Sequence, residues 1–337
     1  MKKFQTVEEV VAAFETATRA AGLSRNTRRG YTATVQDFAS LLKAGTISGP
    51  QAYFDFLSTV RQLSPQSVWH ALNPLKFLYE KVLEAEEFGT FQLPRRNKNR
   101  RIPCELSHAD IINILCQLGR IERLQASLLY GCGLRVESDM LKLRLKDIHL
   151  DDRVLVIQTG KGDKSRALVL PESLIPDLEI QLRACRKQWE KDRAHGIICP
   201  VEEDSLMRKF GRKTFGTLPW YHLFPSRVVH DTPRGKERWH ATDKRLASAL
   251  KSAAEQLGIM QRVNPHAVRH SYATNLLRSG VDIRTIQQQL GHSSVETTEI
   301  YAHATGAKGV PSPLDAGSPA PLPTSETIIP FPVRRTA

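Results

Sequence analysis

The stretch LPRRNKNRR, residues 93–101, constrains the fold more than any other segment. Five of its last seven residues are Arg or Lys and none of these seven is apolar, so it cannot add to a hydrophobic core. A chain of 337 residues is long for one domain and comfortable for two. We therefore predict two domains joined by this segment, which is either a solvated spacer or a strap on a phosphate backbone.

The composition favours a polyanionic partner. Lys and Arg number 48 against 35 Asp and Glu, a net charge of +13, and the basic residues cluster along the chain. Nucleic acid is the partner that this excess indicates, and charge kept for solubility is the alternative. The N-terminus lacks the apolar region of a secretory signal, and no run has transmembrane length. Five scattered cysteines without a CxxC spacing indicate free thiols in a reducing cytoplasm, not a cysteine metal site.

The domain boundaries follow from these features. We place a first domain at residues 1–92, the basic linker at 93–104 and a second domain at 105–304. Residues 305–337 contain too many prolines for a folded segment, which indicates a flexible tail. If the linker is a strap, its phosphate contacts are made by Arg95, Arg96, Lys98, Arg100 and Arg101.

The first domain is predicted to be helical throughout. Apolar residues recur at helical spacing after a capping box formed by Thr6 and Glu9, and a third helix begins at Pro50. The helix between them begins after Ser24, and the apolar residues on one of its sides are Val35, Phe38, Leu41 and Leu42. A fourth helix is expected over 65–82, with a kink at Asn73–Pro74 because a proline cannot donate a backbone hydrogen bond.

One pair of strands interrupts the helices of the second domain. Helices are expected from a capping box at Ser107 to about residue 148, and RVLVIQT and SRALVLP on either side of GKGDK predict a β-hairpin. A helix follows at 171–194, then an irregular aromatic-rich segment at 196–243. Further helices are expected at about 243–257, 265–279, 283–290 and 294–302. The predicted fold is mainly α with a small β-hairpin or sheet, a helical domain followed by a mixed α/β domain.

The six residues HAVRHS concentrate positive charge at the start of a helix. His266 shares a helix face with Arg269 and with His270. Zinc is disfavoured, because Ala267 stands where a metalloprotease has Glu and because Arg269 would repel a metal. The free N–H groups at a helix start bind anions, so a phosphate clamp is the better interpretation.

Each of four further polar residues is by itself weak evidence for a functional site. Arg135 follows the glycine-rich GCGL, Lys161 lies at the tip of the predicted hairpin, and His292 follows a glycine at a helix end. Tyr301, nine residues after His292, would by itself be a packing tyrosine.

Taken together, these stretches resemble the tyrosine recombinases. The resemblance rests on LLYGCGLRVES, TGKGDKSRALVLP, NPHAVRHSYATNLLRSGVDIRTIQQQLGHSS and TTEIYAH, and it extends to about residue 316. It implies that residues 1–92 are a SAM-like core-binding domain and residues 105–304 a catalytic domain. The catalytic residues that it implies are Arg135, Lys161, His266, Arg269, His292 and Tyr301.

These residue types account for a DNA strand transfer. The two arginines hold the negative charge that grows on the scissile phosphate, and Tyr301, assisted by His266, is the nucleophile. Lys161 protonates the leaving 5′ hydroxyl, while His292 donates to the phosphate. The product is a 3′-phosphotyrosine, so no ATP, metal or other cofactor is expected. The resemblance also implies a homotetramer assembled on DNA, no membrane partner, and a bacterial, nucleoid-associated cytoplasmic location.

A narrower resemblance is to the integron integrases. It rests on RKFGRKTFGTLPWYHLFPS, within an insert at about 196–222, on RGKERWHATDKRLASALKSAAEQLGI and on GAKGVPSPLDA. It implies integration and excision of gene cassettes, and binding of a folded single-stranded site as well as duplex DNA. The base contacts would be made by Trp220, Tyr221, Trp239 and His240. Burial of Trp220 and Trp239 in a core is the alternative.

The sequence departs from the family at one place. The family's first box reads G-x-R-[IV]-S-E, whereas this chain has GLRVESDM, as if one residue were inserted after Arg135. An extra helical residue rotates everything beyond it by about 100 degrees unless a π-bulge absorbs it. With a π-bulge, Asp139 replaces the family's acid, and without one Arg135 or the leucines behind it are misplaced.

Three functions therefore remain open from the sequence. The first is an active integron-type recombinase. The second is a DNA-binding protein that keeps the recombinase fold but has lost its chemistry, and the third is a phage- or transposon-type tyrosine recombinase whose insert is incidental.

Overall fold

The chain consists of two units, Met1–Arg101 and Ile102–Ala337, and each contains one of the two large groups of buried side chains. The structure, a computed structural model, describes residues 4–95, 106–158, 165–201, 204–282, 285–286, 289–290 and 312. Each unit has its own hydrophobic core, which is the condition for folding as a domain.

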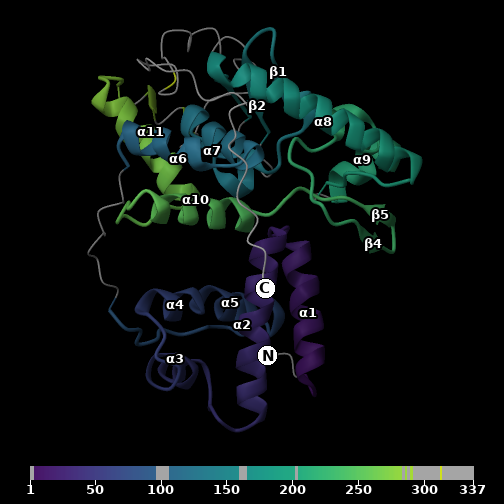
Figure 1. The fold of residues 1–337 in the computed structure, drawn as a ribbon. Helices are drawn as coiled ribbons and strands as arrows, with labels where there is room; N and C mark the ends of the chain where they lie inside the picture. The colour runs from purple at the N-terminus through teal and green to yellow at the C-terminus, as the bar shows by residue number, and fades with distance from the viewer. Residues whose placement is uncertain are drawn as a thin grey trace, which may run out of the picture. The chain divides into compact units, whose positions relative to one another are not determined.

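The first unit is built from helices (Figure 1). These are α1 (Val7–Ala20), α2 (Arg25–Lys43), α3 (Pro50–Thr59), α4 (Pro65–His70), α5 (Leu72–Phe77) and a π-helical turn, η1 (Leu78–Val82). Phe14, Val35 and Phe38 are among the side chains that fill its core. The expectation that Leu42 lies on the core side of α2 was wrong, because it is 42% exposed. Leu41 precedes it by about 100 degrees of helix rotation, and only Leu41 packs on the core.

The predicted capping box at Thr6 and the predicted kink in the fourth helix both differ in detail from the structure. Thr6 accepts the Glu9 N–H as predicted, but the Glu9 carboxylate accepts the Gln5 N–H, one residue earlier than in a capping box. The predicted fourth helix is interrupted at Ala71, between α4 and α5, one turn before Pro74. The cause is local, since Pro74 has no N–H to donate to the carbonyl four residues earlier.

The helices of the second unit surround its core. They are α6 (His108–Gln117), α7 (Arg120–Cys132), α8 (Ile175–Ala194), α9 (Asp204–Phe215), α10 (Lys244–Gln256) and α11 (Pro265–Arg278). Figure 1 shows α6, α7 and α11 lying together, with α10 beside them. Ser107 and Asp110 form the predicted capping box of α6, and Asn264 caps α11 by accepting the Ala267 N–H. The helices expected at 283–290 and 294–302 lie largely or wholly outside the described residues.

The predicted hairpin is present as part of a three-stranded antiparallel sheet. Its strands are β1 (Ile148–His149), β2 (Val154–Ile157) and β3 (Arg166–Val169), in the order β1-β2-β3. Ile157 pairs with Arg166 at the end of the ladder nearest the hairpin tip. The tip itself, with Lys161, lies outside the described residues.

The sequence pattern predicted an irregular segment at 196–243, and this prediction was wrong. The segment contains α9 and a second hairpin formed by β4 (His230–Thr232) and β5 (Gly235–Glu237). Gly211 has φ +73° inside α9, and this break hides the helical period from a sequence pattern. Figure 1 shows α9, β4 and β5 at the carboxyl end of α8.

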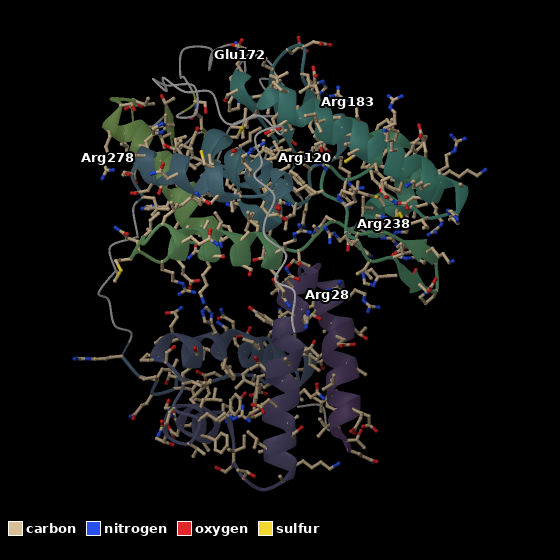
Figure 2. The ribbon with its side chains drawn as sticks, viewed as in Figure 1. Arg28, Arg120, Glu172, Arg183, Arg238 and Arg278 are labelled. Carbon is tan, nitrogen blue, oxygen red and sulfur yellow. The ribbon has the colours of Figure 1, made fainter. Side chains whose placement is uncertain are left out.

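Buried charges fix this insert to the rest of the unit. Asp192 of α8 accepts hydrogen bonds from Arg238 Nε at 2.6 Å and from the Tyr221 hydroxyl at 2.7 Å. Arg144 donates to the carbonyls of Pro200 and Trp220 at 2.7 and 2.5 Å. Arg238 lies between the end of α8 and the second hairpin (Figure 2). The insert is therefore a packed part of the unit that presents its residues in fixed positions.

Within the described ranges, no helix is both long and apolar enough to cross a membrane.

Candidate active site

Gly133 turns the chain so that Arg135 follows α7 directly. It ends α7 with φ 59° and ψ 36°, the left-handed conformation that favours glycine. A Cβ there would lie 2.6 Å from the ring of Tyr272 on α11. Glycine thus permits both the turn and the close approach of α11 to the end of α7.

The residues after Arg135 form a π-helical turn, η2 (Val136–Met140). The N–H groups of Met140 and Leu141 donate to the carbonyls five residues earlier, those of Arg135 and Val136, at 2.9 and 3.0 Å. The extra residue is therefore absorbed within one turn, as a π-bulge would absorb it. Leu141 and Leu143 beyond it remain buried in the core.

Asp139, in this turn, gathers the cationic groups of the site. Its buried carboxylate accepts hydrogen bonds from the Arg135 N–H at 3.0 Å and the Ser138 hydroxyl at 2.9 Å. Arg166 Nη2 of β3 donates to it at 2.6 Å. Burial acts to raise the pKa of Asp139, but the Arg166 charge and these hydrogen bonds outweigh it and hold the pKa below its ordinary value.

The two predicted phosphate-binding arginines meet at this carboxylate. Arg135 Nη1 lies 4.0 Å from Asp139 Oδ1, and Arg269 Nη1 lies 3.9 Å from Oδ2. Arg269 also donates to the carbonyls of Gly133 and of Leu290, the latter at 3.0 Å. Arginine has five N–H donors, and those that these contacts do not use can bind a ligand. Burial and the charge of Arg135 lower the pKa of Arg269 to about 10, which still keeps it charged at neutral pH.

His266 lies in the first turn of α11, one turn before Arg269, and is exposed. An exposed imidazole beside the free N–H groups of a helix start can reach an anion bound there. Lys161, His292 and Tyr301 lie outside the described residues. The structure thus brings together Arg135 and Arg269, with His266 on the same helix as Arg269.

The aromatic residues of the insert differ in their exposure. The ring of Tyr221 is buried and its hydroxyl is held by Asp192, so its proposed base contact is wrong for this structure. Trp220 is half-buried, with its ring 4.8 Å from that of Phe215 and with Lys146 Nζ 4.4 Å from its centre. Trp239 and His240 are also half-buried. Three of the four predicted residues therefore keep exposed surface.

Of the five basic linker residues, Arg95 is exposed, and Arg96, Lys98, Arg100 and Arg101 lie outside the described residues. In the described part of the chain, no group of three or more His, Cys, Asp or Glu side chains could hold a metal ion.

Sequence reasoning missed two cationic residues. Arg166 contacts Asp139 and thereby joins the arginine pair, and Lys146 lies over Trp220. Arg166 sits in SRALVLP, where strand alternation would have shown only that it faces the side of the sheet opposite to Ala167. No local signal predicts a contact between a strand and a turn 27 residues earlier.

Comparisons with known proteins identify the family. Residues 108–308 match the phage integrase family, and residues 11–87 match the phage integrase N-terminal SAM-like domain. The chain belongs to the phage integrase family. It is thus a tyrosine recombinase, a member of an enzyme class that cuts and rejoins DNA strands.

The relatives of this recombinase include proteins from several bacteria. An "Integrase/recombinase" of Escherichia coli is 42% identical over 273 residues, covering 80% of each chain. The tyrosine recombinase XerD of Agrobacterium fabrum is 30% identical over 265 residues, covering 74% of this chain and 71% of the relative.

Solved structures share the fold. The Tn1549 transposon integrase in complex with circular intermediate DNA is 15% identical, covers 88% of this chain and 98% of that chain, and has a TM-score of 0.56. XerH bound to difH substrate is 19% identical, covers 92% and 98%, and has a TM-score of 0.50. The predicted architecture, a helical N-terminal domain and a mixed catalytic domain, is confirmed by these neighbours and by the SAM-like match.

Proposed function

We propose that this recombinase is an integron-type integrase that integrates and excises gene cassettes through a 3′-phosphotyrosine intermediate. The observation that carries its catalytic part is the meeting of Arg135 and Arg269 within 4.0 Å of the Asp139 carboxylate. Two guanidinium groups held together in a partly buried site can bind both nonbridging oxygens of a phosphodiester.

The remaining catalytic roles come from the family pattern. Tyr301 attacks phosphorus, and its proton passes to His266 as the bond to the 5′ oxygen breaks. Lys161 gives a proton to that oxygen, and His292 donates to the phosphate. The bond energy is kept in the tyrosine link, so a second 5′ hydroxyl can reverse the step without ATP. The cationic side chains provide the charge that metal ions provide in other phosphoryl transfers, so we expect no cofactor.

The π-helical turn favours an active enzyme over one that has lost its chemistry. A misplaced register would remove Arg135 from Arg269 or expose the leucines after it. Instead, Arg135 and Arg269 share Asp139, and Leu141 and Leu143 are buried.

The packed insert supports the integron type. A hollow of about 470 Å³ is lined by Lys146, Arg183 and Leu218 among others, and Lys146 also lies over the Trp220 ring. Arg183 belongs to α8 (Figure 2). A half-buried indole and a hollow with cationic walls, which share Lys146, suit an unpaired base and its phosphate. We propose that this surface binds a folded single-stranded site, and that four protomers assemble on two such sites or on duplex DNA.

A covalent-trapping assay tests this function. A nicked duplex and a folded single-stranded hairpin, each with the recombination site, are incubated with the protein and separated on a denaturing gel. A slow protein–DNA band on the hairpin that is absent with Tyr301→Phe is the expected result. An adduct on duplex alone would favour the phage- or transposon-type enzyme, and binding of the hairpin without any adduct would show a recombinase fold that has lost its chemistry.

A further inference from the structure

Three guanidinium groups surround one buried carboxylate in this site. The Asp139 side chain has no exposed surface, and Arg166 Nη2 lies 2.6 Å from its Oδ2. Arg269 and Arg135 lie farther from it, at 3.9 and 4.0 Å. Arg166 is therefore the cation that forms the direct ion pair, and the other two stand just beyond hydrogen-bond distance.

This order of distances decides what Arg135 and Arg269 can bind. A buried carboxylate needs a cationic partner, because desolvation of an unpaired charge is costly. With Arg166 in place, that need is met by a residue from the sheet. Without Arg166, the nearest cations are Arg269 and Arg135, and a movement of about 1 Å would bring either one into hydrogen-bond contact with Asp139. Either movement would use a guanidinium N–H donor for Asp139 that would otherwise bind the phosphate.

Arg166 is placed for this task by the sheet. It pairs with Ile157 across the β2–β3 ladder, and its side chain is only 12% exposed. Its Nε is buried and has no hydrogen-bond partner in the described part of the chain. The Nη2 group is the donor committed to Asp139, and the burial of the side chain leaves it little freedom to move away.

We propose that Arg166 is a positioning residue for recombination: by pairing with Asp139 it keeps Arg135 and Arg269 available to the scissile phosphate. The inference rests on the proposed phosphate-binding role of those two arginines. It assigns Arg166 no contact with DNA, so its effect must depend on the charge of Asp139.

A double-mutant cycle tests this dependence. The rate of covalent adduct formation on a nicked duplex is measured under single-turnover conditions for the wild type, Arg166→Gln, Asp139→Asn and the double variant. We expect Arg166→Gln to lower the rate of adduct formation about tenfold when Asp139 is present. In the Asp139→Asn background the same substitution should lower the rate less than about twofold, because the two residues act in one network. An equal loss in both backgrounds, or none in the wild type, overturns the proposal, since Arg166 would then contact DNA directly or be dispensable.

Three further variants complete the experiment. Arg153→Gln removes an exposed arginine paired with Glu172 at the other end of β2, and its rate is expected to stay unchanged. Arg166→Lys keeps a cation beside Asp139 and replaces Arg166→Gln in the experiment if that variant does not fold. A loss of adduct-formation rate in Arg166→Lys as large as that in Arg269→Ala overturns the proposal. Arg269→Ala is the test of the proposed function itself, because an undiminished rate there would refute the phosphate clamp whatever Arg166 does.

Discussion

The Met140 N–H donates to the Arg135 carbonyl at 2.9 Å, five residues back along the chain. The Leu141 N–H donates to the Val136 carbonyl in the same way. Each of these two hydrogen bonds spans one residue more than an α-helical hydrogen bond does. As a result, Asp139 lies at the fourth position after Arg135 and still reaches the Arg135 N–H. The turn therefore reconciles the unusual box GLRVESDM with an intact arginine pair.

Deletion of Glu137 should convert this turn to an α-helical one. Glu137 is exposed, and its removal leaves GLRVSDM, with the acid at the position that the family pattern has. Because α-helical bonds are the more favourable, we expect an unchanged or higher melting temperature and retained covalent trapping. Insertion of one Ala after Glu137 is the control and should abolish trapping, since the turn already holds its extra residue. Loss of trapping by the deletion would show that the π geometry itself is required.

Replacement of Trp220 should separate the two kinds of DNA site. Trp220→Ala removes a half-buried indole that lies under Lys146, and one lost base stack weakens binding by about 1–3 kcal/mol. We expect this loss on a folded single-stranded site and little change on duplex, as measured by native gel titration. Trp220→Phe keeps an aromatic face and should retain most of the binding. Equal weakening on both substrates would contradict a base contact.

Removal of the Asp192 carboxylate should destabilise the second unit. Asp192 is 2% exposed and accepts from Arg238 and Tyr221, so Asp192→Ala leaves a buried guanidinium with backbone carbonyls but without its carboxylate partner. We expect a loss of about 3 kcal/mol in the free energy of unfolding, measured with urea. Asp151→Ala, at an exposed turn, is the matched control and should change it little. A small effect of both would mean that the insert is not held by this ion pair.

The stability that Asp139 provides should disappear in acid. Its folded pKa lies below the ordinary value of 3.8, so its charged form stabilises the fold above that pH. As the pH falls below 3.8 toward the lower folded pKa, the carboxylate takes up a proton and this contribution is lost. The difference in unfolding free energy between the wild type and Asp139→Asn should therefore be largest near neutral pH and shrink in acid. A difference that stays constant with pH would assign the effect to hydrogen bonding alone.

Much of the local structure is determined by the sequence alone. The Ser107–Asp110 capping box, the Asn264 cap and the hairpin of β2 and β3 depend on residues a few positions apart. The catalytic candidates could also be named, because their residue types and spacing match a family pattern. Where a pattern was interrupted, as by Gly211 in α9, the prediction failed.

Tertiary structure decided how these parts meet. Tyr221 and Trp220 are neighbours in an aromatic segment, yet only Tyr221 is buried, because Asp192 of α8 accepts its hydroxyl. The pairing of Arg166 with Asp139 joins a strand to a turn. Such contacts depend on which surfaces the core brings together, and no local period encodes that. The sequence determined which groups are present, and the packing of α7, α11 and the sheet determined which of them share one carboxylate.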